Sequence, residues 1–390
     1  QQPEFTVDAL PEEERLDLTG LDAYAIDDAD SNDPDDAISF DGQVFWVHVA
    51  DVAAMVNHDS ELDMEARRRA ANLYLPEGLV HMLPESVTHG LGLGLNEISP
   101  ALSIGFVVSE TADISEIRIS PSWIKAQRLS YAEAEEQLDN RFLAINRICA
   151  LFRQKRLANN AAEINLPEAS VRLKNDEIQI RPLEKLGSRQ MVTDAMLMAG
   201  QAVAQFCQDN GIPIPFAVQP EPETVQKPVK TSEMYAYRRQ FKASKTSFEP
   251  ELHFGLGLQA YTRATSPLRR YSDLVVHQQL RAYLAGEAVL SVEQLAEKVL
   301  SVDQQSASIR RTERLSNQHW KLVYLKRNPQ WQGEAVIVDI DERKSTIIIP
   351  ELAMESKIRT RDSFRLDDTI RVQISNVDLP EQTAFFQYLK

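Results

Sequence analysis

The pattern of hydrophobic and polar positions predicts strands after a polar, acidic lead-in at residues 1–20. Residues 43–50 form an almost continuous apolar run, and with residues 37–40 they predict a hairpin that turns at Asp41-Gly42. Shorter runs predict strands at 102–108 and 116–119. His48, inside the first of these runs, is expected to be a core histidine with satisfied hydrogen bonds rather than a metal ligand.

Apolar positions spaced three and four residues apart predict helices over the middle of the chain. Ser60 is expected to open a helix that ends at residues 74–76. The strongest helical pattern covers 188–210, with Ser188 as N-cap and Gly211 as C-cap. Weaker helical patterns cover 131–138 and about 140–162. The proline-rich residues 212–232 are expected to form a long loop. A capping box at 291–294 is expected to open a further helix.

From Gly333 the period changes from helix to strand. Short β runs are expected at Glu334–Ile340, Thr346–Ile349, Ser356–Thr360, Thr369–Val377 and Ala384–Leu389. Five strands at this spacing fit a small OB-type barrel, a fold that often binds single-stranded nucleic acid, and they also fit an SH3-like barrel. The predicted fold class is therefore α+β, with a mixed α/β domain followed by a small five-stranded OB β-barrel.

Composition narrows the class of protein. The net charge of −16 argues against nonspecific coating of nucleic acid, although it permits basic residues along one channel. Cys149 and Cys207 are the only cysteines, and both are expected to be reduced core thiols in a cytoplasmic protein. No apolar run is long enough to predict a membrane span, and no signal peptide is visible.

The densest chemistry lies in an acidic stretch between two short apolar flanks. Residues 27–36 contain six aspartates, together with Asn32 and Pro34, which predict a loop. Oxygen ligands crowded on one loop suit hard cations such as Mg²⁺ or Mn²⁺. A solvated turn is the ordinary alternative. An EF-hand loop starting at Asp28 is excluded, because it would need glycine at residue 33 and glutamate at residue 39.

A second stretch predicts a phosphate-binding element. Ser266 followed by Pro267 is expected to start a helix, with Arg269 and Arg270 in its first turn. A helix N-terminus attracts anions, and arginine can grip two phosphate oxygens at once. The alternative is that these arginines only form surface ion pairs.

These motifs together resemble a known family. The spacing Asp27-x5-Asp33-x-Asp35-Asp36, then residues 48–51, then residues 261–271, is similar to the catalytic RNB domain of the RNase II/RNase R exoribonucleases. The resemblance covers about residues 20–325 and implies a lead-in at 1–20, an RNB-type catalytic domain at 21–327 and an OB-fold RNA-binding domain at 328–390. It also implies a magnesium-dependent, processive 3′→5′ exoribonuclease that releases nucleoside 5′-monophosphates from single-stranded RNA, in a protein expected to be a cytoplasmic monomer.

The same resemblance assigns roles to individual residues. The expected metal ligands are Asp27, Asp33, Asp35 and Asp36, and the expected catalytic residues are Asp35, Arg269 and Asp33. The residues expected to bind substrate are Tyr74, Tyr131, Ser266, Arg269, Arg270 and Glu313. The sequence departs from the family's pattern at Thr193, Gly200 and Val171.

Two other functions remain open at this point. A catalytically weak RNA-binding regulator could retain the same fold, and the acidic loop alone would also fit a DNA-directed metal nuclease. Loss of the aspartates would favour the regulator, but all four are present.

Overall fold

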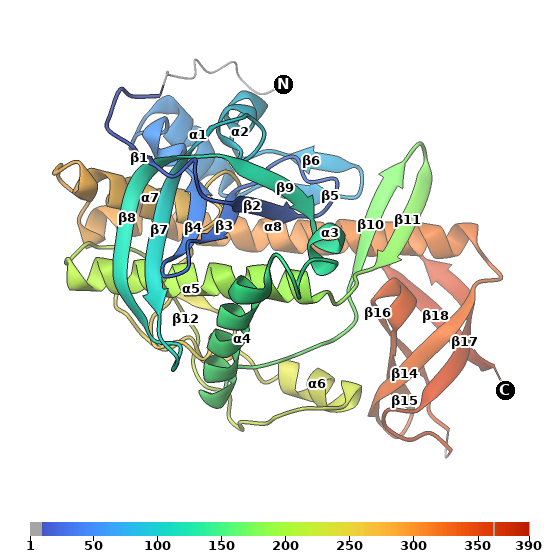
Figure 1. The fold of residues 1–390 in the computed structure, drawn as a ribbon. Coiled ribbons are helices and arrows are strands. Elements are labelled where there is room, and N and C mark those ends of the chain that lie inside the picture. The colour runs from blue at the N-terminus through green and yellow to red at the C-terminus, as the bar shows by residue number, and fades with distance from the viewer. Residues whose placement is uncertain (1–9, 362, 390) are drawn as a thin grey trace.

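The computed structural model describes residues 10–361 and 363–389. Its largest element is a seven-stranded sheet in the order β1-β8-β7-β4-β3-β2-β9, which Figure 1 shows at the left of the molecule. The strands are β1 (Leu16–Asp17), β2 (Ala23–Asp27), β3 (Asp36–Phe40), β4 (Phe45–Ala50), β7 (Ser99–Val108), β8 (Ile114–Ile124) and β9 (Ala126–Ser130). The predicted hairpin is confirmed, with Ile38 opposite Val47.

The two faces of this sheet carry side chains of different size. Large residues such as Ile26 and Val47 face α4 (Leu143–Ala158) and α5 (Gly187–Asp209). Small residues such as Ala25 and Ala37 face the other side, so helices can approach the backbone closely there. That side is covered by α1 (Glu61–Arg69), α2 (Glu85–Leu91), α7 (Tyr271–Leu284) and the first half of α8 (Val292–Arg327).

The helix that begins after Ser60 is shorter than predicted. Ser60 caps α1 as expected, accepting a hydrogen bond from the Asp63 backbone N–H at 3.1 Å. The helix ends at Arg69, because Ala70 takes a positive φ of 65°. Residues 73–75 are then not helical: β5 (Leu73–Leu75) pairs with β6 (Gly78–Val80).

The strongest predicted helix is present, but its N-cap is wrong. Ser188 lies inside α5, whose N-cap is Leu186. The Ser188 hydroxyl instead donates to the carbonyl of Tyr131 at 2.7 Å and ties α5 to α3 (Tyr131–Glu135). The predicted loop at 212–232 also contains structure, since β12 (Phe216–Val218) pairs with β13 (Lys245–Ser247) and α6 (Thr231–Arg238) begins at its end.

The C-terminal residues form the predicted OB-type barrel. Its strands are β14 (Gln332–Ile340), β15 (Lys344–Ile349), β16 (Met354–Arg359), β17 (Thr369–Asp378) and β18 (Thr383–Leu389), in the order β16-β15-β14-β17-β18. A hydrogen bond of 3.0 Å from Ser356 to the carbonyl of Ala384 links the two edge strands and nearly closes the barrel. The short helices η1 (Val52–Ala54), η2 (Phe254–Leu256) and η3 (Pro350–Leu352) complete the described elements.

The long helix α8 joins the two parts of the molecule. Figure 1 shows it running behind the sheet toward the barrel. Its last turns carry Leu322 and Leu325 into the barrel core. A two-stranded hairpin, β10 (Ala169–Lys174) and β11 (Glu177–Pro182), contacts α8 between the sheet and the barrel.

Part of the segment 1–20, which was expected to be a lead-in, belongs to the sheet as β1, and residues 1–9 lie outside the described residues. Leu16 and Asp17 pair in parallel with Ser122 and Trp123 of β8. The buried Arg15 forms an ion pair of 2.8 Å with Asp51, which is also buried. Within the described ranges, no helix is both long and apolar enough to cross a membrane.

Candidate active site

The acidic loop joins the ends of the neighbouring strands β2 and β3 and is held in place by backbone contacts. It leaves β2 at Asp27 and enters β3 at Asp36. The carbonyl of Asp35 accepts the Ala50 N–H at 2.8 Å, and the carbonyl of Pro34 accepts the Leu93 N–H at 2.9 Å. Residues 28–30 are exposed, but Asp33 and Asp35 are buried, so the second half of the loop is not the solvated turn considered above.

Asp35 is the anchor of Arg269. Its Oδ2 accepts the Arg269 Nε–H at 2.9 Å, and its Oδ1 accepts the Leu268 backbone N–H at 2.8 Å. Burial raises the pKa of Asp35 well above its ordinary value, although the Arg269 charge opposes that rise. The Arg269 side chain is 39% exposed and also donates from Nη2 to the Ser266 hydroxyl at 3.2 Å. Asp35 and Ser266 therefore orient a guanidinium group whose outer edge is open.

Asp33 is at the centre of a second set of hydrogen-bonded side chains. Its Oδ2 accepts hydrogen bonds from the Tyr74 hydroxyl at 2.6 Å and from Asn72 Nδ2 at 2.9 Å. The backbone N–H of Tyr74 donates to Glu313 Oε1 on α8 at 2.9 Å. Oδ2 of Asp33 is thus occupied by two hydrogen-bond donors. Glu313 binds the backbone of Tyr74 and so holds the strand that carries this side chain.

The remaining two aspartates are coupled by charge. Burial raises the pKa of Asp36 to about 7, with Arg269 opposing the rise and Asp27 adding to it. Among the described residues, the Asp36 carboxylate accepts no hydrogen bond, whereas Asp27 accepts the Asp28 backbone N–H at 2.8 Å. A carboxylate that is costly to ionise and lacks a donor is suited to a cationic partner.

The donor set partly fits a magnesium ion. All four side chains offer carboxylate oxygens, which Mg²⁺ prefers. Across residues 10–361 and 363–389, however, no three His, Cys, Asp or Glu side chains are grouped so that they could hold a metal ion. Magnesium is commonly bound through one or two carboxylates, substrate phosphate oxygens and water, so a complete protein cage is not required.

Five of the ten predicted site residues line two neighbouring cavities, and Asp35, Asp36, Ser266, Arg270 and Glu313 line neither. One cavity of about 540 Å³ is bordered by Asp27, Asp33, Tyr74 and Arg269. Tyr131 borders the other, of about 400 Å³, beside the β10–β11 hairpin. The structure therefore brings Asp27, Asp33, Tyr74 and Arg269 to one cavity and Tyr131 to the adjoining cavity, which shares lining residues with the first.

The predicted helix start at Ser266-Pro267 is wrong. The N–H groups of Arg269 and Arg270 both donate to the carbonyl of Ser266, at 3.3 Å and 3.0 Å, and close a turn. Arg270 is then extended, with φ −139° and ψ 123°, and α7 begins only at Tyr271. Its guanidinium group donates to both oxygens of Asp273, at 3.0 Å and 2.6 Å. Arg270 is thus bound within the turn and does not line either cavity.

Three further residues that contact the predicted ones or line these cavities were not expected from the sequence. Asn72 bridges Asp33 and the Met82 backbone N–H, and Asn317 lines the larger cavity one helical turn after Glu313. Arg189 lies over the ring of Tyr131, with its guanidinium carbon 3.9 Å from the ring centre. The four-residue spacing from Glu313 could have identified Asn317; no comparable local signal marks Asn72.

The comparisons with known proteins agree with this architecture. Residues 15–286 match the RNB domain, and residues 331–389 match the RNase II-type exonuclease C-terminal S1 domain. An uncharacterised ribonuclease of Synechocystis is 35% identical over 94% of this chain, and the chain spans 59% of that relative's length. A sheet-based α/β domain with buried aspartates facing an arginine, followed by an OB-type barrel, is the architecture of a ribonuclease class. The chain belongs to the RNase II/RNase R family.

Solved structures show the same fold at lower identity. The RNase R of Mycoplasma genitalium in complex with ribose-methylated single-stranded RNA superposes with a TM-score of 0.82, at 20% identity over 96% of this chain and 72% of that one. Yeast Ssd1, described as a pseudonuclease, superposes with a TM-score of 0.75, at 18% identity over 92% of this chain and 52% of that one. The fold alone therefore does not decide catalytic activity.

Proposed function

We propose that this chain is a magnesium-dependent 3′→5′ exoribonuclease that hydrolyses single-stranded RNA processively to nucleoside 5′-monophosphates. The observation that carries the proposal is the pairing of the buried Asp35 with Arg269 at the wall of a cavity that Asp27 and Asp33 also line. A fixed guanidinium group beside carboxylates can bind a phosphodiester and stabilise the charge that develops during its cleavage.

In this proposal each side chain has a limited task. Arg269, held by Asp35 and Ser266, presents its open N–H groups to the reacting phosphate. Tyr74, fixed by its hydrogen bond to Asp33, offers an aromatic ring to the last base. Glu313 holds the backbone of Tyr74 and so sets the position of that ring.

Magnesium would be held by one or two of the carboxylates of Asp27, Asp33, Asp35 and Asp36, together with phosphate oxygens and water. When bound, it would activate water and neutralise charge on the phosphate. The Asp36 carboxylate accepts no hydrogen bond from the described residues, which supports a cation beside it.

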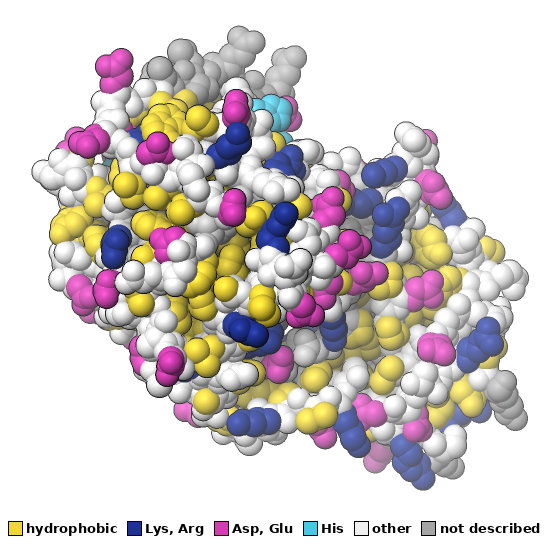
Figure 2. Space-filling view, in the orientation of Figure 1, with side chains coloured by type: hydrophobic (Ala, Val, Ile, Leu, Met, Phe, Trp, Pro, Cys, Tyr) yellow, Lys and Arg dark blue, Asp and Glu magenta, His cyan; other side chains and the backbone are white. Residues whose placement is uncertain are grey.

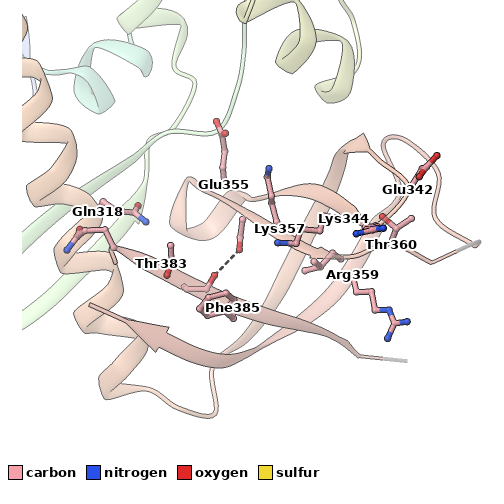
Figure 3. A pocket seen from close by; sticks show the side chains of 14 residues that line it. Gln318, Glu342, Lys344, Glu355, Lys357, Arg359, Thr360, Thr383 and Phe385 are labelled. Carbon is pink, nitrogen blue, oxygen red and sulfur yellow. Dashed lines mark hydrogen bonds between the residues drawn. The ribbon is translucent and has the colours of Figure 1, made fainter. Parts of the chain in front are cut away.

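The barrel offers a second contact for RNA. A hollow of about 850 Å³ on its surface is lined by Lys344, Lys357 and Arg359, and Figure 3 shows these side chains with the half-exposed ring of Phe385. Cations beside an aromatic ring are typical of single-strand binding surfaces on OB folds. We therefore propose that the division near residue 327 separates a catalytic domain from an RNA-binding domain.

A digestion series tests the proposal. Matched single-stranded RNA and DNA, each labelled at the 5′ end, are incubated with the protein and Mg²⁺. The proposal expects a shrinking labelled RNA, release of nucleoside 5′-monophosphates and little change in the DNA. RNA binding without any shortening would favour the alternative, a catalytically weak RNA-binding regulator, which the fold shared with a yeast pseudonuclease keeps open.

A further inference from the structure

The β10–β11 hairpin has two chemically different faces. Cross-strand partners point to the same side of a hairpin, and residues two apart along one strand do so as well. Val171 and Ile178 therefore belong to one face, where both are buried, and Ile180 on that face packs against the barrel core. The other face carries Ser170, Arg172, Lys174, Gln179 and Arg181, together with the acidic Glu177 opposite Lys174.

The polar face borders the smaller cavity. Five of its six residues, all but Glu177, line the space of about 400 Å³ that also holds Tyr131 and Arg189. Figure 2 shows Lys and Arg side chains gathered at the position of β10–β11, next to a group of Asp and Glu side chains. In a chain of net charge −16, such a gathering of cations at a cavity is unusual.

The hairpin is fixed rather than loosely attached. Its turn residues Asn175 and Asp176 both have positive φ, 50° and 62°, which is typical of a two-residue type I′ turn. Arg327 at the end of α8 donates to the carbonyl of Asp176 at 2.8 Å. The N–H of Leu173 donates to the carbonyl of Pro76, next to the strand that carries Tyr74, at 2.8 Å. The polar face therefore keeps a defined position beside the active-site cavity.

Charge on this face is only partly compensated. Arg172 forms an exposed ion pair with Asp30 at 3.3 Å, and Arg189 forms one with Asp28 at 2.5 Å. Lys174 lies opposite Glu177 but forms no ion pair within the described part of the chain, and Arg181 forms none there either. Exposed ion pairs contribute little to stability, so a polyanion could displace Asp30 from Arg172 at small cost.

The two cavities meet at this point. Asp28, Asp30, Ser170, Arg172 and Leu183 line both of them. A continuous surface therefore runs from the polar face of the hairpin, across the acidic loop, to the cavity lined by Tyr74 and Arg269.

We propose that the polar face of the β10–β11 hairpin is a track for the phosphates of single-stranded RNA, which binds the nucleotides that precede the 3′ end lying in the active-site cavity. Arg172, Lys174 and Arg181 contact phosphates, and Asp30 holds Arg172 in place until RNA arrives. This inference rests on the proposed exoribonuclease function.

The test measures RNA binding in EDTA, so that hydrolysis does not interfere. A labelled oligouridine is titrated with the wild type and with a hairpin variant that combines Arg172→Gln, Lys174→Gln and Arg181→Gln, over a range of salt concentrations. A control variant combines Arg118→Gln, Lys125→Gln and Arg147→Gln, which removes the same charge from exposed positions that line neither cavity.

The hairpin variant is expected to bind roughly tenfold more weakly, with a salt slope lower by about 2, because each lost phosphate contact on a single strand lowers the slope by about 0.7. The loss is expected to be smaller for a trinucleotide, which is too short to reach from the active site along the hairpin. The control variant is expected to retain most of the affinity. Equal losses in both variants, or no loss in the hairpin variant, would overturn the inference.

A second variant keeps the test decisive if the triple substitution reduces folding. Asp30→Asn removes the carboxylate that competes for Arg172, so it is expected to bind the oligouridine more tightly than the wild type. Weaker binding by this variant would contradict the track. If the wild type binds RNA through the hairpin but never shortens it, the proposed exoribonuclease function is overturned and the hairpin inference stands. If the wild type shortens RNA but the hairpin substitutions do not weaken binding, the hairpin inference is overturned and the proposed function stands.

Discussion

Replacing Asp35 by asparagine separates catalysis from stability at a single side chain. The carboxylate accepts two hydrogen bonds, from the Leu268 N–H and from Arg269 Nε, and asparagine has only one acceptor oxygen. If that oxygen stays with Leu268, the side-chain NH₂ group faces the guanidinium donor. Arg269 then loses its orientation, and the removal of such a preorganised contact typically lowers the rate by roughly 10²–10³, or about 3–4 kcal/mol.

The same change should affect folding far less. Burial raises the pKa of Asp35, which means that ionising it inside the protein is unfavourable despite the Arg269 charge. Asparagine removes both the ion pair and this cost, so we expect the free energy of unfolding in EDTA to change by no more than about 2 kcal/mol, in either direction.

The assay combines single-turnover hydrolysis of a labelled RNA with Mg²⁺, binding of the same RNA in EDTA, and a thermal melt. Asp139→Asn, an exposed carboxylate with no hydrogen-bond or ion-pair partner in the described residues, provides the control with the same charge change. A single-turnover hydrolysis rate of Asp35→Asn within tenfold of the wild-type rate would refute the role given to the Asp35–Arg269 pair. So would a rate loss explained entirely by unfolding.

Other substitutions test neighbouring parts of the account. Tyr74→Phe removes the hydrogen bond to Asp33 but keeps the ring; we expect a loss of about 1 kcal/mol in unfolding free energy by urea titration and little loss of RNA affinity. Asp273→Asn removes the partner of Arg270 and should destabilise the protein by about 2–4 kcal/mol at neutral pH. Burial would raise the pKa of Asp273, but Arg270 holds that pKa below its ordinary value. The ion pair's contribution to the free energy of unfolding is therefore complete above the unfolded pKa and disappears as pH falls through the folded pKa. Urea titrations of the wild type and of Asp273→Asn should converge in acid. Replacing Lys357 by Gln in the barrel should lower the salt slope of RNA binding by roughly 0.7 without stopping hydrolysis, and an unchanged slope would exclude that contact.

Local signals in the sequence predicted much of the fold. The strand periods at 37–50 and after Gly333, and the caps at Ser60 and Ser291, rely on neighbours within a few residues, and the structure confirms them. His48 is buried, with Ser39 and Ser103 as hydrogen-bond partners, as its position in an apolar strand suggested.

The errors occur where distant parts of the chain decide the local structure. Ser188 resembles an N-cap, but its hydroxyl is taken by the Tyr131 carbonyl from an element more than fifty residues earlier. Ser266-Pro267 resembles a helix start, but Arg270 forms a bridge to Ala71 and delays the helix until Tyr271. No periodicity or capping pattern contains these contacts.

The candidate site shows the same division. The acidic loop and the arginine motif were identifiable from residue type and spacing, yet the sequence did not indicate that Asp35 holds Arg269 or that Arg270 turns toward Asp273. The hairpin track depends on the register of β10 and β11 and on the packing of one hairpin face against the barrel and α8, which only the three-dimensional structure provides.

The most direct test of the central claim compares two labels on one RNA. A single strand labelled at the 5′ end, and the same strand labelled at the 3′ end, are each digested by the wild type with Mg²⁺ and with EDTA. The account predicts that the 3′ label is released first as a mononucleotide, that the 5′ label remains on a shrinking strand, and that EDTA stops both. Release of the 5′ label first, internal cleavage, or equal activity in EDTA would contradict it.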